Sequence, residues 1–524
     1  MNRRRFRRAR HLMAAAVATL IVSGCGGGPI DGGFGGPIGE IDPDAILRIT
    51  SSSPTRNLDP YLQTSYGGWG YLTVVFDRLT TVDKDGKLIP GLAKSWQFAE
   101  DGSYLELKLR TDVSFHDGAA FDAAAVAANI HRGQNMEGST VADALQNITS
   151  VEEIDNSTAR LHLRPGTGVE LPGVFSTNVG MMVSPETIAA GTDIRNDPGG
   201  AGSGGYVVTE YVPEESLSLA RAGGGPNWDP KAGRLAGIEF EWIPDARTRL
   251  NGMKTGMTDL SWVSSANEVI EAQTLGRNRT LGVDEVVFRN VLGLYMRPDG
   301  DLAKPEVRQA VAAAIDPAAV SALFSGTCTP HRQLYPAGSW PADENYTYPY
   351  QYDPDKARAL VQAAGGAQIA LTFAAGTNTE NTANVLQSTL SQAGIDTDLN
   401  PVPNTQNEPR YIAGDFPSMV ANSFNAKVDP AETVNTFLFG AYALANGNQQ
   451  IRDLVTRAAD PTLTEEQRAP LYHQAWDLTL KEAMFVPICN QTNATLFTSQ
   501  VVGAQDIPWA DLGIFDIRHV AMTK

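Results

Sequence analysis

The chain has 524 residues, more than one hydrophobic core normally serves, so we expect two or more lobes. Its formal net charge of −18 is typical of an acidic globular protein and excludes nucleic acid and anionic lipid as partners of the folded body, because such a surface repels polyanions. The 50 glycines and 31 prolines indicate many turns and favour a loop-rich α/β chain over a helical bundle.

Residues 1–24 have the pattern of an export signal. Six arginines lie between positions 3 and 10, and the apolar stretch that follows ends at Val22 and is too short to span a bilayer permanently. The tetrapeptide Val22-Ser23-Gly24-Cys25 resembles the bacterial lipobox, which implies lipidation of Cys25 and cleavage before it. Arg4-Arg5-Phe6 fits a twin-arginine signal and an arginine-rich Sec signal equally well, so the export route stays open.

Residues 25–44 are rich in glycine and proline and show no hydrophobic periodicity, which predicts a flexible tether. Acyl chains on Cys25 would then hold the body at the outer face of the bacterial cytoplasmic membrane. No later stretch reaches 18 apolar residues, so we expect no further membrane-spanning segment.

Two further cysteines, Cys328 and Cys489, lie far apart in the sequence. An exported protein in an oxidising compartment often pairs such residues, and a bridge would tie the middle of the chain to its C-terminal end. Two separate buried thiols are the equally weighted alternative.

Strand and helix patterns alternate from residue 45 onward. Residues 45–49 predict a first strand, and alternating apolar and polar residues predict further strands at 104–110, 160–163 and 239–242. Capping residues predict helices that begin at Pro305, at Asp316-Pro317, at Asp353-Pro354 and at the capping box of Thr464 and Gln467. This interleaving favours α/β lobes over an all-β design.

Templates of catalytic sites are largely missing from the sequence. Gly86-Lys87 is followed by leucine where a P-loop needs serine or threonine. The glycines at 200, 202 and 205 precede an expected strand, whereas a dinucleotide site needs a helix there, so they predict a turn. The seven histidines form no His-x-x-x-His pair, and we expect neither a metal nor a cofactor. A carboxylate pair for glycoside hydrolysis stays open.

Several segments, in order, resemble the extracytoplasmic solute-binding proteins of family 5, the oligopeptide, dipeptide and nickel receptors of bacterial ABC importers. The best match runs from Pro90-Gly-Leu-Ala-Lys-Ser-Trp96 through Asp101-Gly102 and Leu107-Lys-Leu-Arg110 to Val113-Ser-Phe-His-Asp-Gly118. Gly202-Ser-Gly-Gly-Tyr206 and the segment from Val307-Arg-Gln-Ala310 to Asp316 match further family patterns. Most of these residues form turns or core, so the signature reports the fold and the ligand site lies elsewhere.

The resemblance implies an α/β, two-lobed, periplasmic-binding-protein-like fold of type II, in the large peptide-receptor subclass. The larger lobe is then discontinuous, with residues 45–286 and a return segment at 484–524, and the smaller lobe spans 287–483. Crossover strands would form the hinge, and ligand contacts made by both lobes would favour closure.

The sequence departs from the family where peptide termini are bound. Peptide receptors carry a tryptophan and an aspartate just before the Asp-Pro pair that is here Asp429-Pro430, but residues 422–428 contain neither, and Lys427 lies among them. The segment 374–378, where dipeptide receptors carry an arginine, also lacks one. We therefore hypothesise a longer or modified peptide, or a sugar-like or other polar solute.

Candidate ligand-binding residues are aromatic, amide and acidic side chains, which provide stacking faces and directional hydrogen bonds. They are Tyr66, Trp69, Asn178, Trp340, Phe424, Asn425 and Asp429. Ordinary packing is the alternative for each of them. For Asp429 a further alternative is that it only caps the helix that Pro430 begins.

The sequence thus predicts a monomeric binding lipoprotein, not an enzyme, which passes a peptide or other small polar solute to the permease subunits of an ABC importer. Two alternatives stay open. One is a secreted α/β hydrolase that acts on a cell-envelope substrate. The other is a ligand sensor that does not transport.

Overall fold

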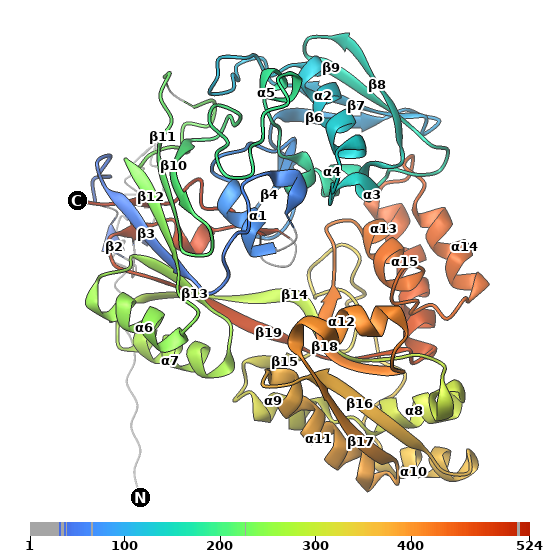
Figure 1. The fold of residues 1–524 in the computed structure, drawn as a ribbon. Helices are drawn as coiled ribbons and strands as arrows, with labels where there is room; N and C mark the ends of the chain where they lie inside the picture. The colour runs from blue at the N-terminus through green and yellow to red at the C-terminus, as the bar shows by residue number, and fades with distance from the viewer. Residues whose placement is uncertain (1–30, 33–35, 38, 64–65, 226, 511–513) are drawn as a thin grey trace, which may run out of the picture.

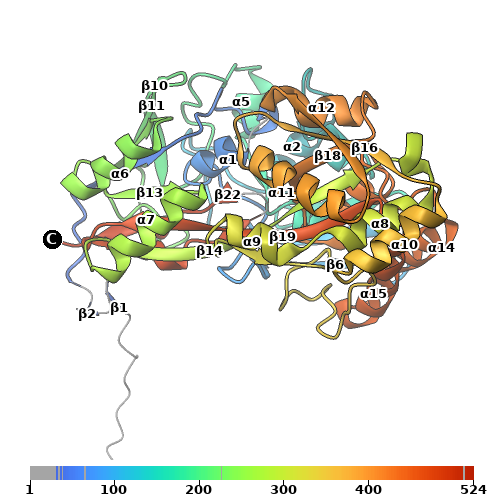
Figure 2. The ribbon, with the colours of Figure 1, turned by 90° about the horizontal axis from the view of Figure 1, so that it is seen from below.

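Two lobes make up the molecule, and two long strands connect them (Figure 1). The computed structural model describes residues 31–32, 36–37, 39–63, 66–225, 227–510 and 514–524. Strands β14 (Gly282–Met296) and β19 (Phe485–Phe497) pair antiparallel along their length. Seen from below, they run from the larger lobe into the smaller one (Figure 2). The predicted two-lobed α/β fold is confirmed, whereas the predicted export signal and Cys25 lie outside the described residues.

One sheet extends through both lobes, and eleven of the described strands belong to it. Its spatial order is β10 (Tyr206–Val212), β11 (Ser216–Arg221), β12 (Gly237–Trp242), β3 (Ile46–Ser51), β13 (Leu260–Val263), β19, β14, β18 (Ser418–Asn425), β16 (Gln368–Ala374) and β17 (Asp396–Val402), with β15 (Cys328–Pro330) paired to β19 beside this path. The β14–β19 pair lies at the middle of this order. The two lobes therefore share one continuous hydrogen-bonded sheet.

Smaller sheets and seven helices complete the larger lobe as described. A four-stranded antiparallel sheet has the order β6 (Ala93–Phe98), β7 (Tyr104–Leu109), β9 (Thr158–Leu163), β8 (Ile148–Asp155). Two-stranded pairs are β1 (Asp31–Gly32) with β2 (Gly36–Pro37), β4 (Thr80–Val82) with β5 (Leu88–Pro90), β20 (Val501–Val502) with β23 (Ala521–Met522), and β21 (Trp509–Ala510) with β22 (Ile514–Phe515). The helices are α1 (Tyr66–Leu72), α2 (Ala123–Asn135), α3 (Ala142–Leu145), α4 (Leu171–Val174), α5 (Pro185–Ala189), α6 (Ala246–Thr255) and α7 (Ala266–Arg277).

The α-helices of the smaller lobe, as described, are α8 (Pro305–Ala314), α9 (Pro317–Leu323), α10 (Pro354–Ala363), α11 (Asn378–Gln392), α12 (Asn404–Ala413), α13 (Pro430–Thr433), α14 (Gln449–Ala458) and α15 (Glu465–Lys481). Four of them, α8, α9, α10 and α15, begin at the predicted positions. The side chains of Asp316 and Asp353 accept hydrogen bonds from the first turns of α9 and α10, and Thr464 and Gln467 form the capping box of α15. These predictions are confirmed.

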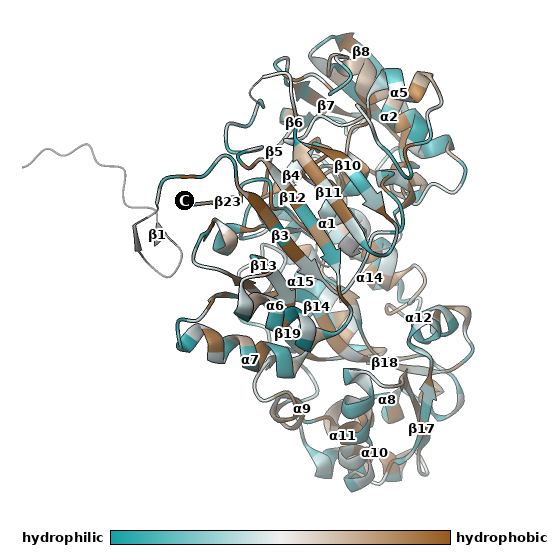
Figure 3. Ribbon diagram, turned by 60° about the vertical axis from the view of Figure 1, so that its left-hand side comes forward, coloured by the Kyte–Doolittle hydropathy of each residue, from teal (hydrophilic) through white to brown (hydrophobic). Residues whose placement is uncertain are grey.

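Separate apolar cores stabilise the two lobes. The buried core of the smaller lobe comes from residues between 291 and 489, whereas the cores of the larger lobe come from 47–281 and 494–522. Strand β3 buries Leu47 and Ile49, and its apolar character is visible in Figure 3. The lobe boundaries at 287 and 483 stay predictions, and the core of the smaller lobe extends beyond residue 483 to Cys489.

The glycines before β10 form the predicted turn. A Cβ placed on Gly202 would lie 2.1 Å from the carbonyl oxygen of Val75, and one on Gly204 would lie 2.3 Å from that of Val74. Only glycine allows this approach of two backbone segments, and a strand follows it, not a helix. The segment is therefore structural, as the sequence indicates.

Buried charges attach the return segment to the larger lobe. Arg518 contacts Asp77 at 3.2 Å and Asp516 at 2.9 Å, and Asp516 also pairs with Arg78. Burial would raise the pKa of the Asp516 carboxyl, but the two guanidinium groups hold its pKa below the ordinary value. Trp228 Nε1 donates to Asp77 at 2.9 Å. The last residues of the chain are thus fixed by ion pairs to its first hundred.

Within the described part of the chain, no helix has both the length and the apolar character that crossing a membrane requires. Cys328 and Cys489 are joined by a disulfide, with their Cα atoms 5.4 Å apart. The bridge links β15 to β19 and lies in the smaller lobe at one end of the crossover.

Replacing both cysteines, as Cys328→Ala with Cys489→Ala, should lower the free energy of unfolding by about 2–4 kcal/mol, because the bridge closes a long loop of the unfolded chain. Denaturant unfolding measures the change. Wild-type protein treated with a reductant should lose about the same amount. Two free thiols in unreduced wild-type protein, found by mass spectrometry, would contradict the bridge.

Candidate functional site: a cleft between the lobes

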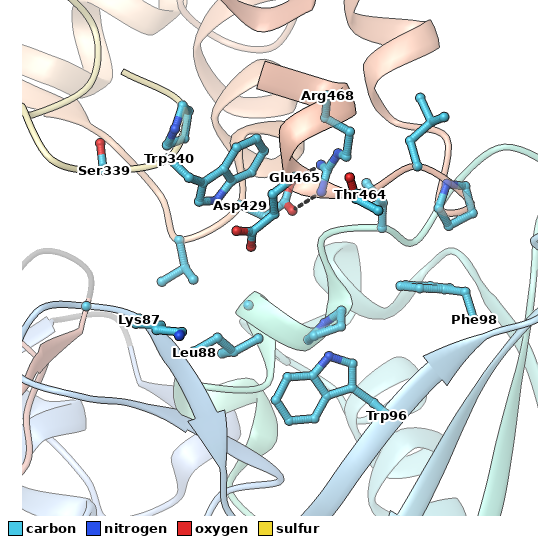
Figure 4. Close-up of a pocket in the computed structure, with 18 of the residues that line it drawn as sticks. Lys87, Leu88, Trp96, Phe98, Ser339, Trp340, Asp429, Thr464, Glu465 and Arg468 are labelled. Atoms are coloured by element: carbon cyan, nitrogen blue, oxygen red, sulfur yellow. Dashed lines mark hydrogen bonds and ion pairs between the residues drawn. The ribbon is translucent and has the colours of Figure 1, made fainter. Parts of the chain in front are cut away.

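A cleft of about 1000 Å³ lies between the two lobes and is lined by both (Figure 4). The larger lobe contributes the loop 85–88, the β6 end and following turn at 96–100, and the α4 residues 172–173. The smaller lobe contributes the loop 338–341, residues 428–429 before α13, and 461–465 with Arg468 at the start of α15. This volume accommodates a small organic solute.

The lobes touch at both sides of this cleft. A Cβ placed on Gly173 would lie 3.3 Å from Val428 Cβ and 3.4 Å from the amide nitrogen of Asp429. Val428 also packs against a small apolar group of the larger lobe that contains Trp69, Val82 and Leu88. At the other side, the turn at Gly102 meets Pro461, because a Cβ on that glycine would lie 2.9 Å from the proline ring. The structure therefore shows the lobes in contact around the cleft.

Asp429 and Arg468 form a bidentate ion pair in the wall of the smaller lobe. Arg468 donates to the two carboxylate oxygens of Asp429 at 2.7 and 2.8 Å, and Oδ1 also accepts the Ala431 amide, which caps α13. Arg468 Nε donates to the Ala458 carbonyl at 2.7 Å. Burial lowers the pKa of Arg468, but the Asp429 charge outweighs it, so that the net shift is upward. Both charged groups are thus committed to each other.

Aromatic side chains face the cleft from both lobes. Trp340 makes an edge contact with Tyr472 at 5.9 Å between ring centroids, and the Arg468 guanidinium lies 5.1 Å from its ring. Tyr472 in turn stacks on Trp476. Trp96 projects from the opposite wall, where it packs partly on the core of the larger lobe. These rings are held by their own lobes before any ligand binds.

Lys87 and Glu465 line the cleft, and within the described residues their side chains form no hydrogen bond or ion pair; the same holds for the carboxylates of Asp85 and Glu100. Glu465 is the first residue of α15, and its carboxylate has no hydrogen bond or ion pair with any described residue. Burial raises the pKa of Glu465, and the neighbouring Asp429 charge adds to this rise. Lys87 lies on the wall of the larger lobe, across the cleft (Figure 4).

A second cavity of about 810 Å³ adjoins the cleft beside the crossover strands. It shares five lining residues with the cleft, among them Arg289 and Ser339. Burial raises the pKa of Asp284 to about 6, and the charge of Asp506 adds to the shift. Burial lowers the pKa of His331 to about 4, so this imidazole is neutral at pH 7. Among the described residues, no group of three His, Cys, Asp or Glu side chains is arranged to hold a metal ion.

The structure brings some predicted site residues to the cleft. Trp340 and Asp429 line it, although Asp429 is occupied by Arg468 and caps α13. Trp69 lies at the lobe contact next to Val428. Tyr66 begins α1, and its side chain is outside the described part of the structure.

Three other predictions need correction. Asn178 is 2% exposed and donates to the Pro60 carbonyl at 2.8 Å within the larger lobe. Phe424 is fully buried between Phe437 and Phe485 in the smaller lobe. Asn425 is 1% exposed at the end of β18, where it pairs with β14. Residues of the same lobe that are distant in sequence cover these three side chains, so they do not face the cleft.

Four residues of the cleft carry no signal in the sequence that points to a ligand site. Trp96 reads as a core residue and does pack partly on the core, while Lys87 follows a glycine in a hairpin turn without any motif. Glu465 and Arg468 follow the Thr464 cap, which explains a helix start without pointing to a ligand. Only the folded chain brings these residues together.

Comparison with known proteins identifies similar chains along most of the length. Residues 87–444 match the model of the bacterial extracellular solute-binding proteins, family 5 Middle. The glutathione-binding protein GsiB of Salmonella paratyphi A is 25% identical over 488 residues, which cover 89% of this chain and 92% of that protein. NikA from Brucella suis, solved with Fe(III)-EDTA, has a TM-score of 0.77 at 23% identity, over 91% of this chain and 100% of that one. DppA from Helicobacter pylori, solved with the peptide STSA, has a TM-score of 0.73 at 20% identity, over 92% and 98% of the two chains.

Gly173→Leu should hold the lobes apart, because the added side chain extends into the space that Val428 and Asp429 fill. We expect a larger radius of gyration in small-angle X-ray scattering, with the circular dichroism spectrum of each lobe unchanged. Gly223→Leu is the matched control, since a Cβ at Gly223 meets no atom within 4 Å. Scattering identical to that of the wild type would show that this contact does not limit lobe approach.

Proposed function

Because the chain belongs to family 5 of the bacterial extracellular solute-binding proteins, we propose that it captures a small polar solute between its lobes and delivers it to the permease of an ABC importer. The observation that carries this proposal is the cleft of about 1000 Å³ whose walls come from both lobes. A ligand that contacts both walls favours the closed state, and closure presents a distinct surface to a permease.

The comparisons support a peptide or a molecule of similar size as the solute. GsiB is named a glutathione-binding protein, and the DppA structure holds a four-residue peptide. NikA is solved with a metal chelate, so this fold also accepts ligands that are not peptides. We propose a peptide or other small polar solute for this chain, bound without chemical change.

The first residues of the chain support a proposal for its location. We propose export to the cell envelope and lipid attachment through Cys25 at the outer face of the cytoplasmic membrane. The Val-Ser-Gly-Cys sequence supports this proposal, and labelled palmitate that is incorporated by the wild type but not by Cys25→Ser tests it.

Binding without turnover is the outcome that tests the function. A pool of di- to tetrapeptides should raise the melting temperature, because a ligand present at 100 times its Kd stabilises the native state by about 2.7 kcal/mol. Chromatography of the same mixtures should show unchanged peptides. Trp340→Ala should weaken the shift, whereas Tyr352→Ala, an exposed side chain outside the cleft, should preserve it. Release of cleaved products would favour the hydrolase alternative instead.

A further inference from the structure

We propose that the part of the solute held in the cleft between Glu465 and Trp340 carries a positive charge, as an ammonium or guanidinium group, next to a flat apolar surface. This inference rests on the proposed function, because it takes the cleft as the solute site. It names the chemical class that the walls of this cleft recognise.

Glu465 supplies the negative charge for such a group. Its carboxylate lines the cleft and has no ion pair or hydrogen bond with a described residue. Burial and the nearby Asp429 charge raise its pKa more than the charges of Arg468 and Lys87 lower it, so these two cations compensate the ionised form only in part. A ligand cation beside Glu465 would provide that compensation. The positive end of the α15 dipole helps to keep the carboxylate ionised until the ligand arrives.

The cations of the cleft are poorly placed for an anionic ligand. Arg468 uses its guanidinium on Asp429, the Ala458 carbonyl and the Tyr472 hydroxyl. Arg289 lies against the loop of the larger lobe and donates to the Asp85 carbonyl. Lys87 alone has no partner among the described residues, and it shares its wall with the carboxylates of Asp85 and Glu100. An anionic ligand would therefore face more carboxylate groups than cationic groups that lack an ion pair.

Aromatic rings provide the surface against which the apolar part of the proposed ligand would pack. Trp340 is fixed by Tyr472 at 5.9 Å, and it lies on the same wall as Glu465. Trp96 and Phe98 face the cleft from the larger lobe. A cation within about 6 Å of a tryptophan ring is attracted by the π system, most strongly where water is excluded. The combination of rings from both lobes and a carboxylate that forms no ion pair, Glu465, matches an organic cation better than a neutral sugar.

Three peptides that differ in one side chain test the proposal by isothermal titration calorimetry. The probes are acetyl-Ala-Lys-Trp-amide, acetyl-Ala-Gln-Trp-amide and acetyl-Ala-Glu-Trp-amide, which carry one positive, no and one negative charge. Wild-type protein should bind the lysine peptide about tenfold more tightly than the glutamine peptide, and the glutamate peptide least. Glu465→Gln should remove the preference for lysine while leaving the affinity for the glutamine peptide within about twofold.

Glu466→Gln is the matched control, because Glu466 is the next acidic residue of the same helix turn and does not line the cleft. It should keep the full preference. A wild type that binds all three peptides equally, or binds the glutamate peptide best, overturns the charge inference and leaves the cleft as a solute site. If none of the three binds at millimolar concentration, the inference and the assignment of this cleft as the solute site both fail.

Discussion

The pairing of β14 with β19 is the constraint on which the arrangement of the two lobes depends. In the described chain these strands carry both passages of the backbone between the lobes. Their ladder is interrupted between Val287 and Val291, where β14 has more residues than its partner, and its register shifts again between Leu292 and Gly293. The smaller lobe is therefore tied to the larger one through a single pair of strands with a local irregularity at the passage. Such a connection permits a hinge rotation while each lobe keeps its own core.

Each lobe is held by buried ion pairs whose charged groups are bound to each other. Asp77, Arg78, Asp516 and Arg518 join the return segment to the start of the larger lobe. Asp429 and Arg468 join α13 to α15 in the smaller lobe. Removing one member of such a pair leaves an uncompensated buried charge, so these networks favour rigid lobes. Under the proposed function, rigid walls would allow a small number of side chains, such as Trp340 and Glu465, to select a solute.

Local chemistry made much of the fold predictable. Asp316, Asp353 and Thr464 cap helices because their side chains satisfy amides of the first turn, and this depends only on nearby residues. Alternation in β7 follows from the two faces of a strand. The disulfide was one of two open alternatives, because pairing depends on whether the fold brings Cys328 and Cys489 together.

The site was less predictable for a physical reason. Whether an aromatic or amide side chain reaches a cleft depends on what covers it, and Phe424 and Asn178 are covered by residues distant in sequence. Lys87 and Glu465 have no motif, and they become neighbours of one cavity only when the lobes meet. The missing charges at 422–428 and 374–378 predict the loss of one mode of peptide binding, but they could not reveal charges supplied by other elements.

The central claim, that a solute closes two rigid lobes about the β14–β19 connection, is tested most directly by a distance across the lobes. Spin labels on Glu152→Cys in β8 and Asp355→Cys in α10, both exposed, report that distance by double electron–electron resonance. The account predicts a shorter and narrower distribution when a bound peptide saturates the protein, with two labels inside one lobe unchanged. A distribution across the lobes that stays the same at saturation would contradict it.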